Sequence, residues 1–404
     1  MIKEVHGSVT SPRGFSASSV FCGIKPGSQK PDLGLIHSQS PCVAAAVFTQ
    51  SSIVSAHVVR GRRQLAAGEL QSVIANSGNA NACTGEKGLE DVAVISTLVG
   101  NLLHVAPSRV FVASTGVIGV PLPMERFREG IEAAASSLAP GAQAGHAFAR
   151  AIMTTDTRPK EVAVEVQAGN VRGIVAGAAK GAGMIAPNMA TMLCFLTTDL
   201  CVSKELADAV LRAAVNESFN RITVDGHPSP NDTVVLLANG QAGNARLARG
   251  RKKSEEFADA VLYASNRLAE EIVRNAEGAT KFIEVRVTGA RTTQQAETIA
   301  RAIANSPLVK AAANGEDPNW GRIVTAAGTS GVKLNPAKLV LHIGKEVAYR
   351  RGTPADVPKE RLREEMRSSD LLFWLEVGQG RAKASVWTCD LSCEYVKINA
   401  EYTT

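Results

Sequence analysis

Apolar residues recur every three or four positions along several parts of the chain, and this period is typical of amphipathic helices. The serines at positions 203 and 254 each precede such a pattern, and a serine hydroxyl at that point can accept a hydrogen bond from a free backbone amide of the first turn. The pattern predicts helices at residues 91–104, 123–138, 203–218, 254–276 and 294–313.

Alternating or short apolar runs predict β-strands between these helices. Two of the runs flank Ala168-Gly169-Asn170, a turn in which Gly and Asn tolerate positive φ, so they predict an antiparallel hairpin. A hairpin among interleaved helices and strands favours a mixed-sheet, layered α/β fold over a doubly wound parallel sheet. The predicted strands are residues 161–167, 171–176, 192–198, 233–238, 282–288, 339–343 and 382–389.

Composition indicates an ordinary folded protein. A chain of 404 residues with 45% apolar and 20% charged residues is long enough for two domains or one large α/β body. The net charge is +6, but the basic residues cluster only at 246–253, where no aromatic residue is interleaved. We therefore expect a solvated loop there and no nucleic-acid binding.

The chain shows no signal peptide, membrane span or metal-ligand pattern. No apolar run approaches the roughly 18 residues that cross a bilayer, so we expect a cytoplasmic protein without a membrane partner. Seven scattered cysteines and seven dispersed histidines form neither a CxxC pair nor an HExxH motif. Reduced thiols, no metal and no cofactor are expected.

The most unusual segment is KGAGMIAPNMATMLCFLTTD at residues 180–199. Two glycines, a proline and an asparagine precede Thr191, which opens an apolar strand, so an irregular loop leads directly into a buried element. Such a junction suits an exposed nucleophile, although glycine-rich turns ahead of strands are also common. The segment lacks the third glycine of a dinucleotide fingerprint and any GK[ST], which argues against a nucleotide site.

This segment closely resembles the cleavage-site motif of the ornithine acetyltransferases, also called glutamate N-acetyltransferases. Further stretches resemble the same family in the same order and cover nearly the whole chain. They are GSVTSPRGF at Gly7, ANSGNANACTG at Ala75, ASTGVIG at Ala113, MTTDTRPK at Met153, NRITVDG at Asn220, NDTV at Asn231, EGATK at Glu277, DPNWGRI at Asp317 and VKINAEYTT at Val396.

The resemblance implies that the chain cuts itself between Ala190 and Thr191. The Thr191 hydroxyl attacks the carbonyl carbon of Ala190, an ester forms by an N-to-O acyl shift, and water then releases the Thr191 amine. That amine can serve as the base for the same hydroxyl. We expect an α chain of residues 1–190 and a β chain of residues 191–404, associated as a heterotetramer with two copies of each.

The family also assigns site residues. The Thr115 hydroxyl and the Gly116 amide are expected to form the oxyanion hole. From the residues alone, 114–116 is better described as a turn after a strand at 110–113. Substrate ligands implied by the family are Thr154, Lys180, Thr191, Glu277, Asn399 and Thr404, with Thr155 as an alternative to Thr154.

Lys180 is expected to face a carboxylate and Glu277 an ammonium. Without the resemblance, both would be interpreted as solvated surface charges. The chain departs from the family pattern at 227–230 (HPSP) and at Asn275-Ala276.

The implied reaction is ping-pong transfer of acetyl from N2-acetylornithine to glutamate through an acetyl-Thr191 intermediate. Some family members also accept acetyl-CoA as the donor and so make N-acetylglutamate. Two alternatives remain open at this point: an N-terminal-nucleophile hydrolase or aminopeptidase, and a binding protein that keeps the fold but never cuts itself.

Overall fold

The computed structural model describes residues 2–25, 27–66, 68–186, 192–250 and 254–401. Within this described part, the chain divides into two compact units. The first unit comprises the residues up to 220 together with 227–272, and the second comprises 221–226 and the residues from 273 onward.

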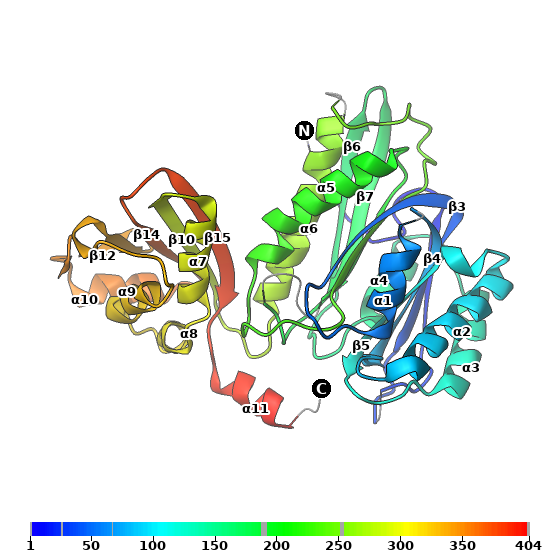
Figure 1. Ribbon diagram of the computed structural model, residues 1–404, viewed down its shortest axis with the longest axis horizontal. Coiled ribbons are helices and arrows are strands. Elements are labelled where there is room, and N and C mark those ends of the chain that lie inside the picture. The colour runs from blue at the N-terminus through cyan, green and yellow to red at the C-terminus, as the bar shows by residue number, and fades with distance from the viewer. Residues whose placement is uncertain (1, 26, 67, 187–191, 251–253, 402–404) are drawn as a thin grey trace. The chain divides into compact units, whose positions relative to one another are not determined.

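The first unit is built on a mixed sheet of nine described strands in the order β1-β6-β7-β8-β9-β3-β4-β5, with β2 paired to β3 (Figure 1). The pairs β8–β9 and β4–β5 are parallel, and the remaining pairs are antiparallel. The strands are β1 Lys3–Val5, β2 Phe15–Val20, β3 Leu33–Phe48, β4 Glu69–Asn79, β5 Val110–Val117, β6 Lys160–Ala168, β7 Val171–Lys180, β8 Leu193–Thr198 and β9 Thr233–Ala238.

Helices cover both faces of this sheet. Leu35 and Ile36 of β3 point to opposite faces, and each lies in a different apolar core. Phe148 of α4 packs into the core that contains Ile36, whereas α2 and α3 pack into the core that contains Leu35 (Figure 1). The helices are α1 Ala56–Gln64, α2 Gly85–Leu103, α3 Met124–Ser136, α4 Ala142–Ala151, α5 Lys204–Glu217 and α6 Glu255–Arg274.

The second unit has its own sheet of six described strands, in the order β13-β12-β11-β14-β10-β15. Ile299 and Ile303 of α7 pack on the buried side chains of β10 and β15. Its strands are β10 Phe282–Ala290, β11 Val340–Ile343, β12 Glu346–Arg350, β13 Thr353–Pro354, β14 Asp370–Glu376 and β15 Ala382–Cys389; its helices are α7 Thr293–Ala304, α8 Pro307–Asn314, α9 Trp320–Gly328, α10 Lys359–Met366 and α11 Cys393–Glu401.

Most of the predicted elements are present, and the mixed-sheet α/β prediction is confirmed. The predicted hairpin is β6–β7, whose Ala168 and Val171 are paired across the turn. The Ser203 hydroxyl accepts a hydrogen bond from Leu206 N and caps α5 as expected. The single helix predicted at 294–313 is wrong, because Pro307 has no amide hydrogen and Ser306 caps a new helix, so the segment forms α7 and α8.

The predicted cleavage site falls between two paired strands of the first unit. Lys180, the last residue of β7, lies opposite Leu193, the first residue of β8. β8 and β9 belong to the predicted β chain, yet they are flanked by β7 on one side and β3 on the other, both of the predicted α chain. A cut in the β7–β8 connection therefore leaves the two pieces joined through the centre of one sheet.

Candidate active site

Thr115 and Gly116 lie inside β5, where they pair with β4, so the interpretation of 114–116 as a turn is wrong. The ladder has an irregularity at Gly78 and Asn79 of β4, directly opposite. A Cβ on Gly116 would lie 2.3 Å from the backbone carbon of Gly78, and Gly116 has φ +134°. Only glycine permits this close approach of the two strands, which leaves Thr115 and Gly116 at the irregular end of the pair.

Lys180 is buried rather than solvated, with 1% of its surface exposed. Its Nζ donates a hydrogen bond to Thr115 Oγ1 over 3.3 Å. Because this bond uses a lone pair of the hydroxyl oxygen, the hydroxyl proton remains available for another acceptor. The structure thus brings together two of the residues singled out by the sequence, and the expectation of a surface charge at Lys180 is wrong.

Asp156 organises the backbone around Lys180. Its Oδ1 accepts hydrogen bonds from Lys160 Nζ at 2.5 Å and Gly181 N at 2.7 Å, and its Oδ2 accepts one from Thr154 N at 3.0 Å. Burial raises the pKa of Asp156, but the Lys160 and Lys180 ammonium groups outweigh burial and hold the pKa well below its ordinary value. This carboxylate fixes the residue after Lys180 and the start of the Thr154 segment.

Sequence reasoning did not assign Asp156, although it lies within the MTTDTRPK motif. The signal that could have identified it is the acid–base pair Asp156 and Lys160, four residues apart inside a family motif. The structure ties the amide of Thr154 to this carboxylate, and the choice between the Thr154 and Thr155 side chains as substrate ligand stays a prediction.

A third lysine belongs to the same region. Lys25 Nζ donates to the carbonyl oxygen of Met153 over 2.6 Å. Burial, together with the charge of Lys180, lowers the pKa of Lys25 to about 8, although the nearby Asp32 carboxylate raises it. The ammonium groups of Lys25, Lys160 and Lys180 outnumber the carboxylates of Asp32 and Asp156, so the region around Thr115 favours a negatively charged group.

In the second unit, the side chains of Glu277 and Asn399 are joined by a hydrogen bond. Asn399 Nδ2 donates to Glu277 Oε2 over 2.8 Å, and Glu277 is only 8% exposed. The expectation of a solvated charge at Glu277 is therefore wrong.

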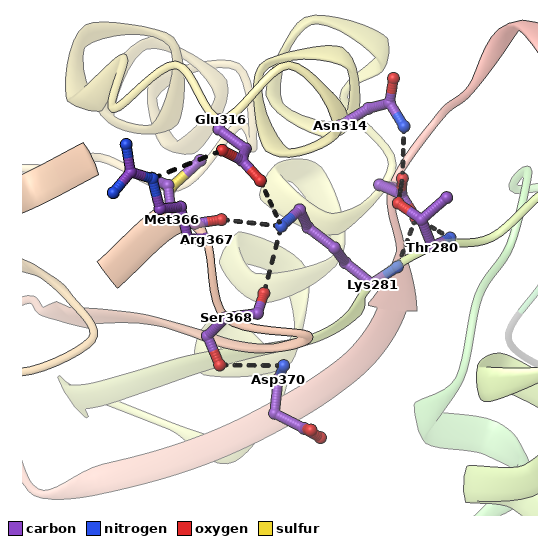
Figure 2. Close-up of polar contacts among 9 residues, drawn as sticks. Thr280, Lys281, Asn314, Glu316, Met366, Arg367, Ser368 and Asp370 are labelled. Carbon is purple, nitrogen blue, oxygen red and sulfur yellow. Dashed lines mark hydrogen bonds and ion pairs between the residues drawn. The ribbon is translucent and has the colours of Figure 1, made fainter. Parts of the chain in front are cut away.

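The backbone that follows Glu277 is held firmly. The Asp390 carboxylate accepts hydrogen bonds from Thr280 N at 2.8 Å and Lys281 N at 2.9 Å. Figure 2 shows the Lys281 ammonium among several acceptors. It donates hydrogen bonds to the carbonyl oxygens of Met366 at 2.9 Å and Ser368 at 3.2 Å. These hydrogen bonds fix the backbone that follows Glu277.

Three predicted site residues, Ala190, Thr191 and Thr404, lie outside the described residues. Thr115, Gly116, Thr154 and Lys180 belong to the first unit, and Glu277 and Asn399 to the second. In the described part of the chain, no three His, Cys, Asp or Glu side chains gather closely enough to hold a metal ion. None of the helices described has the length and apolar character needed to cross a membrane.

Comparison with known proteins identifies the class to which this mixed α/β fold, with its buried Lys180–Thr115 contact, belongs. The ArgJ family model matches residues 16–404, and the chain belongs to this family. The arginine biosynthesis bifunctional protein ArgJ of Symbiobacterium thermophilum is 47% identical over 399 residues, which cover 98% of this chain and 99% of that protein. Its counterpart in Bacillus licheniformis is 43% identical over 404 residues, covering 100% of this chain and 98% of that protein.

A solved structure gives the same family. The crystal structure of the arginine biosynthesis bifunctional protein from Bacillus halodurans is 39% identical, with a TM-score of 0.50 over 52% of this chain and 98% of that chain. The predicted family is confirmed, and with it the enzyme class: the chain is a bifunctional acetyltransferase of arginine biosynthesis, with ornithine acetyltransferase and N-acetylglutamate synthase activity.

Proposed function

We propose that Thr191 carries the acetyl group in this transferase, after self-cleavage between Ala190 and Thr191. The observation that best supports this proposal is the contact of Lys180 Nζ with Thr115 Oγ1. Lys180 is the last residue of β7, and Thr191 belongs to the connection that follows this strand. The contact ties the oxyanion strand β5 to one end of the connection that carries Thr191. A hydroxyl donor and a glycine amide at this point suit a tetrahedral oxyanion.

The same groups would serve both reactions. In self-cleavage, the Thr191 oxygen forms a bond to the Ala190 carbonyl carbon, the peptide C–N bond breaks, and water hydrolyses the resulting ester. In turnover, the free Thr191 amine removes the proton of its own hydroxyl, the oxygen attacks the acetyl carbonyl of N2-acetylornithine, and ornithine leaves with a proton. Glutamate then takes the acetyl group through its amine and regenerates the Thr191 hydroxyl.

We propose that charged side chains recognise the substrate by pairing with its groups of opposite charge. The lysines of the first unit, Lys180 above all, suit the substrate carboxylate, and Thr154 adds a hydrogen bond. Glu277, supported by Asn399, suits the side-chain ammonium of acetylornithine. Thr404 is proposed as a further ligand, and acetyl-CoA as a second acetyl donor.

The two chains are proposed to remain associated as a heterotetramer with two copies of each. The strand order supports the lasting association of the α and β chains, since β8 and β9 lie between strands of the other piece. Separating them would break two ladders of backbone hydrogen bonds in the middle of the sheet.

Intact-mass spectrometry of wild type and Thr191→Ala, with and without N-acetylornithine, tests the proposal. Wild type is expected as two fragments that meet at Ala190 and Thr191, with one acetyl mass on the C-terminal fragment that persists until glutamate is added. Thr191→Ala is expected to stay uncut and unlabelled. Rapid loss of the acetyl mass in buffer would favour a hydrolase, and an uncut, unlabelled wild type would favour a binding protein.

A further inference from the structure

Two consecutive polar side chains, Asn231 and Asp232, come directly before β9 and are buried, with 3% and 0% of their surfaces exposed. They belong to the NDTV motif, to which the sequence assigned no role. The Asp232 side chain bonds to Met192, just before β8, and the Asn231 side chain bonds to Ala80 and to Ser114 of β5. Buried polar groups of this kind carry a large energetic cost unless their partners are well placed.

Asp232 holds the residue that follows Thr191 in the chain. Its Oδ1 accepts a hydrogen bond from Met192 N over 2.9 Å, and the backbone returns the contact from Thr233 N to Met192 O at 3.1 Å. Oδ2 of Asp232 makes no hydrogen bond with the residues that the structure describes. Burial raises the pKa of this carboxyl well above its ordinary value, more than its hydrogen bonds and the Lys180 charge lower it.

Asn231 holds the oxyanion strand. Its Nδ2 donates to two backbone oxygens, that of Ala80 at 2.6 Å and that of Ser114 at 2.7 Å. Ser114 immediately precedes Thr115 and Gly116 in β5. Both hydrogens of one amide group therefore fix the backbone at the point where the proposed oxyanion donors begin.

The strand start itself does not depend on these two side chains. Asn231 O lies 2.9 Å from Thr233 Oγ1 and 3.2 Å from His57 Nε2. Asp232 O accepts a hydrogen bond from Thr49 N at 3.0 Å. Because other groups hold this backbone, the side chains of Asn231 and Asp232 can bond to Ser114 and Met192.

We propose that Asn231 and Asp232 are positioning residues: together they hold Met192, which follows the proposed nucleophile, and Ser114, which precedes the proposed oxyanion donors, in fixed positions relative to each other. This inference rests on the proposed roles of Thr191, Thr115 and Gly116. Asp232 contributes through Oδ1, the oxygen that accepts the hydrogen bond from the Met192 amide.

Isosteric variants of Asp232 test the inference. Asp232→Asn keeps an acceptor for the Met192 amide without a charge, whereas Asp232→Leu fills the same space without an acceptor. We measure the rate of self-cleavage by intact mass, kcat and KM of the cleaved fraction, and thermal unfolding. Thr197→Val is the matched control, because it removes a buried hydrogen bond of β8, from Thr197 Oγ1 to Val9 O, away from the site.

Asp232→Leu is expected to slow cleavage and lower kcat by about a hundredfold with little change in KM, since a small misplacement of reacting groups costs about that much. Asp232→Asn is expected to recover the rate to within about tenfold of wild type. Asp232→Leu with wild-type rates, or Asp232→Asn as slow as Asp232→Leu, would overturn the inference. In the second case the carboxyl itself would take part in proton transfer.

Asn231→Asp provides an independent variant if Asp232→Leu does not fold. It keeps the size of the side chain but sets a carboxylate oxygen against the carbonyl oxygens of Ala80 and Ser114. A fall in kcat at constant KM is expected, and a wild-type kcat would contradict the role of Asn231. All these variants could behave like Thr197→Val while wild type is cut and acetylated at Thr191. That result would contradict this inference alone and leave the proposed function intact.

Discussion

Lys180 Nζ donates a hydrogen bond to Thr115 Oγ1 over 3.3 Å, and each residue is only 1% exposed. The contact joins the end of β7 to the proposed oxyanion strand β5, although the two residues are 65 positions apart. A buried ammonium that donates to a hydroxyl leaves the hydroxyl proton to point elsewhere, and its charge favours a negative oxygen nearby. We propose that the pair acts as one oxyanion-stabilising unit, and the first prediction rests on this proposal.

Thr115→Val removes the hydroxyl but keeps the shape of the side chain, and we expect kcat to fall by roughly 10²–10³-fold, as for the loss of one oxyanion donor. Thr115→Ser keeps the hydroxyl and is expected to retain most of the activity. Steady-state kinetics with N-acetylornithine and glutamate measure both. If Thr115→Val and Thr115→Ser lose the same activity, the hydroxyl has no special role.

Gly116→Ala is expected to prevent self-cleavage, because the added methyl carbon would lie 2.3 Å from the Gly78 backbone and φ +134° is strained for alanine. Gly328→Ala is the matched control, since no atom lies within 4 Å of the added carbon at that position. Intact mass after purification shows the fraction cut, and thermal unfolding shows whether the chain is folded. Complete cleavage of Gly116→Ala would mean that the strands separate easily at this point.

Much of the fold could be predicted from its apolar periodicity, but the strands β3 and β4 could not. β3 runs for 16 residues, yet polar residues near His37 interrupt its pattern where the register with β4 shifts between His37 and Cys42. β4 ends in ANSGN, residues typical of turns. Here they are buried in the strand because their polar groups find partners, as when Ser77 Oγ donates to Ala151 O at 2.5 Å.

The candidate site, too, could be predicted only in part from the sequence. Motif resemblance singled out Thr115, Lys180, Glu277 and Asn399, and the structure brings them together in two pairs, Thr115 with Lys180 and Glu277 with Asn399. The groups that support them were not identified, because their roles depend on partners distant in sequence. Asp390, for example, holds the backbone amide of Lys281 across 109 positions.

Asp156→Asn is expected to destabilise the first unit by about 3–5 kcal/mol at neutral pH, because it leaves the buried Lys160 ammonium without its counter-charge. The folded pKa of Asp156 lies below its unfolded value of about 3.9, so its stabilisation is present above that pH and is lost as the pH falls toward the folded pKa. The gap between wild type and variant should therefore narrow below about pH 4.

Urea unfolding followed by circular dichroism between pH 7 and pH 3 measures this gap. The proteins with and without Asp156→Asn are best compared in the Thr191→Ala background, where the proposed cleavage cannot occur. Asp208→Asn is the control: it breaks the half-exposed Lys204–Asp208 pair and should cost less than about 1 kcal/mol at any pH. A pH-independent gap for Asp156→Asn would show that its charge is not what stabilises the unit.

Glu277→Gln tests the proposed recognition of the substrate ammonium. The variant side chain can still accept the hydrogen bond from Asn399 Nδ2, and the hydrogen bonds of Asp390 to Thr280 N and Lys281 N are untouched, so the segment should keep its shape. What the substitution removes is the negative charge. A hydrogen bond to a charged group is worth about 1.5–3 kcal/mol, which corresponds to a rise in KM for N2-acetylornithine of roughly 10–100-fold.

Glutamate lacks the side-chain ammonium of acetylornithine, so its KM should change by less than about threefold. The matched control is Glu284→Gln, which makes the same charge change in the same unit, on β10, where Glu284 pairs with Arg286. Separate measurement of KM for N2-acetylornithine and for glutamate distinguishes recognition of the ammonium from a general effect on binding. An equal rise in both would assign Glu277 a general structural role, and an equal effect of Glu284→Gln would show that net charge, rather than a contact at Glu277, governs binding.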